Sequence, residues 1–190
     1  VGSAGTLSGI GHYFKKLGRL STKDKPMKGG VRLVLADPVG SILAPLINEN
    51  KKVTPGSWLV EGMGEDFIPD ICDLSLVAEA VAISDAEAFH AARELLAKEG
   101  VLSGSSTGCI LAGALKWCRK QPKQDRPLNV VTFICDSGAK YLSKMFNDFW
   151  MIDNGFIQRP RTNDLRDLVA RRHDLGEDYT LREDHPVRQA

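Results

Sequence analysis

The sequence has almost no excess charge of either sign. Its 190 residues contain 25 lysines and arginines against 24 aspartates and glutamates, and only four histidines. A chain with this balance has no broad basic field to attract nucleic acid, and it has no acidic tail. We therefore expect small molecules or other protein chains as partners, and no nucleic acid.

Long hydrophobic runs are also missing, and so is the pattern of a signal peptide. Although 43% of the residues are apolar, which is ordinary for a domain core, no run approaches the roughly 20 residues that span a bilayer. The chain starts with valine rather than methionine, and both ends interrupt a pattern, so we interpret both as cuts. We expect a cytoplasmic protein with no membrane contact.

The cysteines form neither a C-x-x-C pair nor a metal-ligand spacing with the histidines. They lie in apolar or helical stretches, at Cys72, Cys109, Cys118 and Cys135. Because free cysteine behaves as a small hydrophobic residue, we expect reduced core thiols and no metal site. The histidines are scattered, and no Ser–His–Asp set is evident. No catalytic residue is therefore assigned within this chain.

Short β-type runs alternate with helical patterns along the chain. Runs rich in β-branched or apolar residues predict strands at residues 31–36, 57–60, 74–83 and 130–135, of which 74–83 is ambiguous and 130–135 is the clearest. The six consecutive β-prone residues of that last run predict burial on both faces. Strands separated by helices predict an α/β fold with a parallel sheet, in which ligands bind beyond the carboxyl ends of the strands.

Helices are predicted from apolar spacing at residues 7–17 and 109–119. A third helix is predicted to start at a capping box, in which the Ser84 hydroxyl accepts the Glu87 N–H while the Glu87 carboxylate reaches back. Gly100 is suited to end this helix in the left-handed conformation.

Three segments of small residues fall at strand ends or before helices. Residues 2–6 precede a helix, where free N–H groups and the helix dipole favour an anion, although a tight structural turn explains the glycines equally well. Residues 103–108 could form a second anion cradle, touch a ligand ring through a serine, or simply cap a helix, which their composition favours. Met63 has one glycine on each side, and these two glycines would let a ligand approach the backbone closely.

Six segments in order resemble the second half of the fold-type-II pyridoxal-phosphate (PLP) enzymes. They read GSAGT, ADPVGSIL, EGMGEDFIPD, GVLSGSSTGC, CDSGAKYLSK and NDFWMIDNGF, and they lie within residues 1–157. Within the cysteine synthase/cystathionine β-synthase family the resemblance is greatest to cystathionine β-synthase. It implies that residues 1–157 are the C-terminal part of the catalytic core. The implied fold is the parallel-sheet, three-layer α/β fold of these enzymes, of which this fragment carries the large-domain half.

The resemblance implies that the opening loop binds the PLP phosphate. The matching residues are Gly2, Ser3, Ala4, Gly5 and Thr6. Ala4 departs from the usual glycine of the family. If this position needs a positive φ, the loop must either shift or accept strain.

The resemblance also implies contacts with the cofactor ring and the substrate. Ser106 matches the serine that faces the pyridine nitrogen, and Gly62, Met63 and Gly64 would line the substrate side, with Met63 where the family usually has isoleucine. A hydroxyl can donate to an unprotonated ring nitrogen, whereas a carboxylate would keep it protonated. The family's Schiff-base lysine lies upstream of the phosphate loop, so no lysine of this chain is given that role.

The activity implied is a β-replacement that condenses serine with homocysteine to cystathionine. One alternative is a cysteine synthase that uses O-acetylserine and sulfide. An alternative of another class is a non-catalytic paralogue that acts as a binding or regulatory partner. The resemblance further implies a homodimer or a higher homo-oligomer.

The last part of the chain, residues 158–190, is expected to be a separate region. Arg159-Pro160-Arg161 breaks the preceding pattern. The residues that follow resemble the linker and first elements of the Bateman-type regulatory modules found after many cystathionine β-synthases, and such a module could bind an adenosyl ligand. A disordered charged tail is the alternative.

Overall fold

A computed structural model describes residues 1–123 and 127–158 of the chain. The chain divides into two compact units, Val1–Asn147 and a second that begins at Asp148. The described part of the second unit contains one helix, α5 (Asp148–Asp153). The boundary predicted between residues 157 and 158 stays a prediction, because the region that follows it lies almost entirely outside the described residues.

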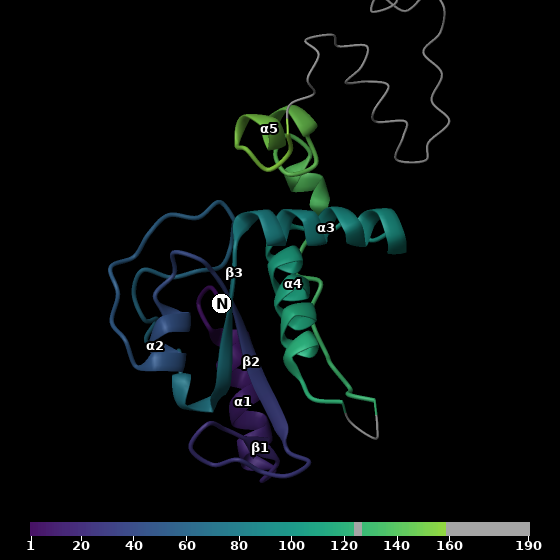
Figure 1. The fold of residues 1–190 in the computed structure, drawn as a ribbon. Coiled ribbons are helices and arrows are strands. Elements are labelled where there is room, and N and C mark those ends of the chain that lie inside the picture. Colours follow the sequence, from purple (N-terminus) through teal and green to yellow (C-terminus); the bar gives the residue numbers. More distant parts are fainter. Residues whose placement is uncertain (124–126, 159–190) are drawn as a thin grey trace, which may run out of the picture. The chain divides into compact units, whose positions relative to one another are not determined.

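Three parallel strands form the sheet of the first unit, in the order β1–β2–β3 (Figure 1). They are β1 (Leu20–Ser21), β2 (Val31–Pro38) and β3 (Val77–Ile83), and a 3-10 turn, η1 (Leu74–Leu76), leads into β3. Pro38 pairs with Ile83, so β2 and β3 end together at their carboxyl edge. The parallel sheet and the strand predicted at 31–36 are confirmed, and the strand predicted at 74–83 is confirmed from residue 77 onward. The sequence did not predict β1.

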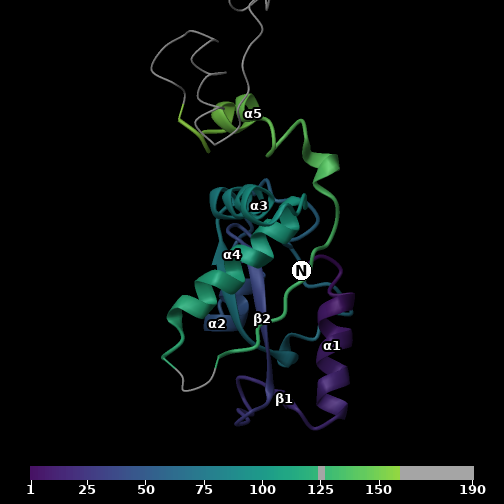
Figure 2. The same cartoon turned by 90° about the vertical axis from the view of Figure 1, so that its right-hand side faces the viewer.

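Helices cover both faces of the sheet. Because side chains alternate along a strand, Leu33 and Leu35 face one side of β2 and Ala36 the other. The first side packs against α1 (Gly5–Lys16) and α2 (Leu43–Glu49), and the second against α4 (Ser105–Lys120). The fit to α4 is close, since a Cβ on Gly113 would lie 2.7 Å from the Ala36 Cβ. Figures 1 and 2 show the resulting three layers, which confirm the predicted fold class.

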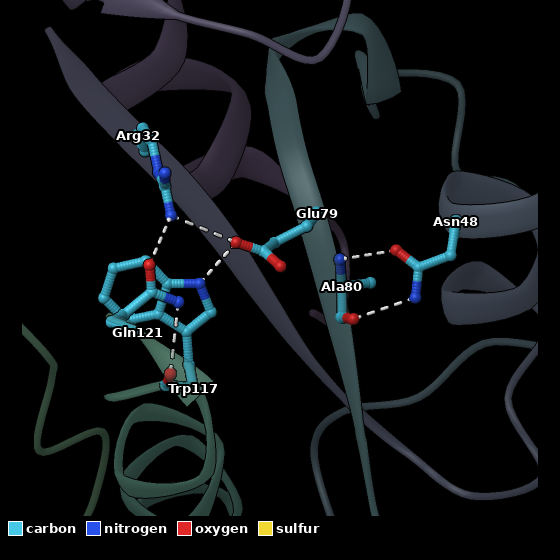
Figure 3. Close-up of polar contacts among 6 residues, drawn as sticks. All are labelled: Arg32, Asn48, Glu79, Ala80, Trp117 and Gln121. Carbon is cyan, nitrogen blue, oxygen red and sulfur yellow. Dashed lines mark hydrogen bonds and ion pairs between the residues drawn. The ribbon is translucent and has the colours of Figure 1, made fainter. Parts of the chain in front are cut away.

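A polar cluster joins β2, β3 and α4 on the second face (Figure 3). The Arg32 guanidinium lies over the Trp117 ring, 4.9 Å from its centroid, and pairs with the Glu79 carboxylate at 3.2 Å. The Trp117 indole N–H also donates to Glu79. Arg32 further donates to the Gln121 side chain at 3.3 Å. One carboxylate therefore links both strands to the helix.

The outer edge of β3 is closed by a side chain instead of a neighbouring strand. The Asn48 amide accepts the Ala80 N–H and donates to the Ala80 carbonyl, each at 2.9 Å (Figure 3). Both backbone groups of Ala80 are thereby satisfied where no described strand pairs with them. Asn48, in α2, thus fastens this helix to the sheet.

The predicted start and end of the third helix are confirmed in α3 (Asp85–Glu99). The Ser84 hydroxyl accepts the Glu87 N–H at 3.2 Å, and the Glu87 carboxylate accepts the Ser84 N–H at 2.8 Å. Gly100 follows with φ 70°. The other two predicted helices also form, but α4 starts four residues before the predicted 109, because the small residues of the 103–108 segment supply its first turn.

The strand predicted at residues 57–60 does not form, so that prediction is wrong. The N–H groups of Leu59 and Val60 both donate to the Asp85 carboxylate, each at 2.9 Å. An extended segment whose donors bond to a side chain has no need of a neighbouring strand. The first residue of α3 therefore holds this segment in place.

The strand predicted at residues 130–135 is also absent from the described structure. Val131 is 84% exposed, so the predicted burial on both faces is wrong. The physical reason is that no described strand lies beside this segment to pair with its backbone. Cys135 is exposed too, so the expectation of four core thiols fails there, although all four cysteines are free and Cys109 is buried.

Candidate functional site

The opening loop and the glycine pair lie against each other. The Gly64 N–H donates to the Val1 carbonyl at 2.9 Å. A Cβ on Gly2 would come within 3.0 Å of the Gly62 carbonyl oxygen, so the two backbones touch without intervening side chains. On its other side, Gly64 packs against Pro38, the last residue of β2. This is the carboxyl edge of the sheet, where ligands of parallel α/β proteins bind.

The opening loop presents unbonded N–H groups at the start of α1. The first helical hydrogen bond runs from the Ser8 N–H to the Ala4 carbonyl at 2.9 Å, and no side chain caps the helix. The N–H groups of Gly5, Thr6 and Leu7 therefore have no partner within the helix. Together with the helix dipole they make a site for an anion such as a phosphate.

Ala4 keeps the left-handed conformation that a glycine would adopt easily. Its φ is 68° and its ψ is 2°. Of the two outcomes considered from the sequence, the loop thus accepts strain. Such a conformation costs an L-residue about 1–2 kcal/mol.

The glycine pair has one open position and one packed position. Gly62 has φ 78°, and nothing lies within 4 Å of where its Cβ would be. Gly64 has φ 90° and packs against the Trp58 ring, whose N–H donates to the Met63 carbonyl at 2.9 Å. Met63 itself is buried. A ligand can therefore approach the backbone at Gly62, while Gly64 and Met63 anchor the loop.

The first turn of α4 holds three neighbouring hydroxyl groups, of which two accept backbone N–H groups. The Ser105 hydroxyl accepts the Glu61 N–H at 3.0 Å, and the Thr107 hydroxyl accepts the Cys135 N–H at 2.9 Å. The Ser106 hydroxyl lies between them, is nearly buried, and has no hydrogen-bond partner among the described residues. The helix cap is Gly104, without a side-chain bond, so the serine-cap interpretation is wrong. Ser106 remains available to a ligand.

A buried carboxyl group lies at the end of β2. Asp37 is completely buried, and one of its oxygens accepts the Ala44 N–H at 2.8 Å, at the start of α2. The other oxygen has no partner. Burial raises the pKa of the Asp37 carboxyl, and the Ala44 N–H opposes this shift. Asp37 thus holds α2 at the edge of the site at an electrostatic cost.

A second polar group lies where the 130–135 segment reaches the start of α4. The Asp136 carboxylate accepts the Tyr141 hydroxyl at 3.1 Å and pairs with Lys140 at 3.4 Å. Burial raises the pKa of Tyr141, and the hydrogen bond to Asp136 raises it further. The phenol therefore stays a donor at neutral pH.

The sequence analysis missed the positioning roles of three residues. Asp85, Ser105 and Ser41 accept N–H groups of the segment from residue 59 to residue 65. Each of these hydrogen bonds joins residues at least 24 positions apart, so no local sequence pattern predicts it. In the sequence, Asp85 is recognisable only as a residue inside the capping box between Ser84 and Glu87.

The described residues fit PLP, the cofactor that the resemblance implies. Its phosphate needs free donors, which the start of α1 has. Its ring nitrogen can accept a hydrogen bond from a neutral donor, and Ser106 is an unbonded hydroxyl close to the surface of the core. Its reacting side needs space beside the backbone, which Gly62 leaves. These three features belong to segments that adjoin in the fold.

Residues 1–123 and 127–158 contain neither a metal-ligand cluster nor a membrane-spanning helix. No cluster of three or more histidine, cysteine, aspartate or glutamate side chains there could hold a metal ion. In the same residues, no helix is long and apolar enough to cross a membrane.

Comparison with known proteins gives consistent sequence matches. Residues 1–136 match the family described as "Pyridoxal-phosphate dependent enzyme". The chain is 34% identical to the cystathionine beta-synthase of Apis mellifera over 165 residues, which are 87% of this chain and 30% of that protein. It is 37% identical to the cystathionine beta-synthase of Dictyostelium discoideum over 83% of this chain and 28% of that protein. The cysteine synthase of Buchnera aphidicola subsp. Schizaphis graminum is 32% identical over 82% of this chain and 46% of that enzyme.

A solved structure agrees at the level of the fold. The chain superposes on an O-ureido-L-serine synthase with a TM-score of 0.62 and 24% identity, over 89% of this chain and 44% of that one. The chain thus spans less than half the length of each of these relatives. With most of its residues matched by the family model, it belongs to the pyridoxal-phosphate-dependent enzymes, in the cystathionine β-synthase and cysteine synthase family.

Proposed function

We propose that the whole protein catalyses a PLP-dependent β-replacement in the synthesis of sulfur amino acids, and that it condenses serine with homocysteine to cystathionine. The observation that carries this proposal is the unbonded Ser106 hydroxyl, whose two neighbours in the chain, Ser105 and Thr107, each accept a backbone N–H. The relatives of the chain include cystathionine β-synthases. When bound, the cofactor supplies an electron sink that eases the loss of a substituent from the β-carbon.

Residues of this chain would hold the cofactor at two places. The N–H groups at the start of α1, together with the hydroxyls of Ser3 and Thr6, would bind the phosphate. Ser106 would donate a hydrogen bond from its hydroxyl to the ring nitrogen and so would keep the ring in one orientation. Because a hydroxyl carries no charge, it leaves that nitrogen unprotonated, which suits loss of a leaving group from the β-carbon.

The glycine-pair segment would hold the amino-acid substrate beside the cofactor. Gly62 offers backbone groups with no side chain in the way. Burial of Met63 and the packing of Gly64 keep this backbone in place and exclude water behind it. In this proposal the lysine that bonds to the cofactor lies in a part of the protein outside residues 1–190.

A cysteine synthase that uses O-acetylserine and sulfide is the second candidate, and the Buchnera relative favours it. The test is to purify the whole protein and to record its cofactor absorbance with and without serine. Turnover is then compared for serine with homocysteine and for O-acetylserine with sulfide. We expect serine to change the spectrum and the first pair to give the higher kcat/KM. A higher value for the second pair would establish a cysteine synthase, and absence of cofactor would indicate a non-catalytic paralogue.

A further inference from the structure

Serine hydroxyls hold the glycine-pair loop, residues 61–65, at both ends. At its start, the Glu61 N–H donates to the Ser105 hydroxyl at 3.0 Å. At its end, the Glu65 N–H donates to the Ser41 hydroxyl at 3.0 Å, and the Glu65 carbonyl accepts the Ile42 N–H at 3.0 Å. The loop is therefore fixed by side chains from two distant parts of the chain.

The two ends differ in how firmly they are held. The end at residue 65 has two hydrogen bonds and the packed Gly64 beside it. The start has the open Gly62, and the Glu61 carboxylate pairs with Lys144 where both side chains are about half exposed. An exposed ion pair of this kind restrains little. Within residues 61–65, the bond to Ser105 is therefore the main restraint on the start of the loop, which follows the two bonds from Leu59 and Val60 to Asp85.

We propose that Ser105 is a positioning residue that sets where the start of this loop lies relative to the cofactor ring. The proposal rests on the proposed function, because it takes Ser106 as the partner of the ring. Ser105 and Ser106 are consecutive in the first turn of α4, so one rigid turn holds both the loop and the ring. Only 1% of Ser105 is exposed, so water cannot easily replace its hydroxyl as the acceptor.

Loss of the Ser105 hydroxyl should affect the substrate more than the cofactor. The phosphate site at α1 and the Ser106 hydroxyl both remain. The loop start, however, would lose its buried acceptor and would move relative to the ring. The substrate would then bind a loop that is correctly placed only part of the time, which raises its apparent KM.

The test compares Ser105→Ala with the parent in the whole protein. We expect unchanged PLP content, a kcat within about twofold, and a KM for the amino-acid substrate raised by about three- to tenfold, as for loss of one net hydrogen bond. In the cofactor-free protein, exchange of the Glu61 amide hydrogen should accelerate by a similar factor. Ser105→Thr keeps the hydroxyl and should restore both values.

Ser103→Ala is the matched control. Ser103 is also completely buried, two residues away, but its hydroxyl has no partner among the described residues. This variant should keep the parent KM and exchange rate. The proposal is overturned if Ser105→Ala keeps the parent values, if Ser103→Ala shows the same change, or if a folded Ser105→Thr is as impaired as Ser105→Ala.

The exchange measurement separates this proposal from the proposed function. If the parent binds no PLP, the proposed function fails, and the role of Ser105 toward a cofactor fails with it. If the parent binds PLP and turns over its substrates but exchange at Glu61 does not respond to Ser105→Ala, only the positioning role is wrong. Loss of PLP from a folded Ser105→Ala would also overturn it, because Ser105 would then act on the cofactor itself.

Discussion

Gly104 and Asp136 are in such close contact that position 104 has no room for a side chain. A Cβ on Gly104 would lie 1.9 Å from a carboxylate oxygen of Asp136 and 2.7 Å from the Tyr141 ring. The Gly104 N–H also donates to the Asp136 carbonyl at 3.1 Å. The start of α4 is thus fastened to the segment that follows residue 135.

We expect Gly104→Ala to lower the free energy of unfolding by about 1–3 kcal/mol, because Asp136 and Tyr141 must both move. Urea denaturation of the whole protein measures this. Gly9→Ala is the control, since nothing lies within 4 Å of that position in α1, and it should raise stability by about 0.5–1 kcal/mol. Parent-like stability of Gly104→Ala would show that this contact is not rigid.

Ala4→Gly should stabilise the protein by up to about 1 kcal/mol. Glycine relieves the left-handed strain at φ 68°, although it also gains freedom in the unfolded chain. Thermal unfolding measures the gain, and PLP retention should be at least that of the parent. Ala4→Val should do the opposite, because a branched side chain fits this conformation poorly. A less stable Ala4→Gly would mean that the loop does not need a left-handed residue.

Ser106→Ala should keep the fold and lose turnover. One net hydrogen bond contributes only about 0.5–1.5 kcal/mol to stability, but the orientation and electronics of the ring also act in the transition state. Turnover should therefore fall well beyond the factor that this energy predicts, and Ser106→Asp should be worse, since it favours a protonated ring. Steady-state kinetics and cofactor content check both. A fully active Ser106→Ala beside an inactive Ser105→Ala would make Ser105 the ring partner.

A double-mutant cycle on Arg32 and Glu79 should give a coupling energy of about 0.2–1 kcal/mol. Both side chains are more than 40% exposed, so solvent weakens the pair. The variants are Arg32→Met and Glu79→Gln, and the coupling should shrink at high salt. The more exposed Glu94–Lys98 pair within α3 should give less. A coupling that does not depend on salt would indicate packing against Trp117 instead of charge.

Asp37→Asn should change how stability depends on pH. Burial raises the pKa of Asp37 in the folded state above its ordinary value of 3.8. The protonated carboxyl therefore contributes to stability at pH values below 3.8. This contribution is lost as the pH rises through the raised pKa of the folded state. The stability of Asp37→Asn relative to the parent should therefore increase with pH across this window. Urea unfolding over a pH series measures it.

Asp73→Asn provides the control of opposite sign. The hydrogen bond from the Ser75 hydroxyl lowers the pKa of Asp73, so its contribution is present above pH 3.8 and is lost as the pH falls. The stability of Asp73→Asn relative to the parent should decrease as the pH rises. If the two variants responded alike, burial would not be the cause at Asp37.

Local sequence predicted the features that depend on neighbouring residues. The capping box at Ser84 and the glycine at 100 involve residues at most a few positions apart, and both form as expected. The composition of residues 57–60 predicts a strand, because nothing local reveals that their N–H donors bond to Asp85. Residues 130–135 have strand composition, but a strand also needs a partner, which composition does not supply.

The same distinction applies to the site. Its small-residue segments could be found from composition, because glycine and serine have local conformational roles. Glu61 and Ser105, by contrast, are 44 positions apart in the sequence. Their hydrogen bond forms only in the folded chain, so composition could not predict it.

The unpaired segment before Asp136 also has a practical consequence. Its large apolar side chains are exposed, namely Leu128, Val130, Val131, Phe133 and Ile134. Residues 128–134 carry no charge and no proline, which makes them a template for intermolecular strand addition. A polypeptide limited to these 190 residues would therefore tend to aggregate through this segment, and masking these side chains should raise its yield in solution.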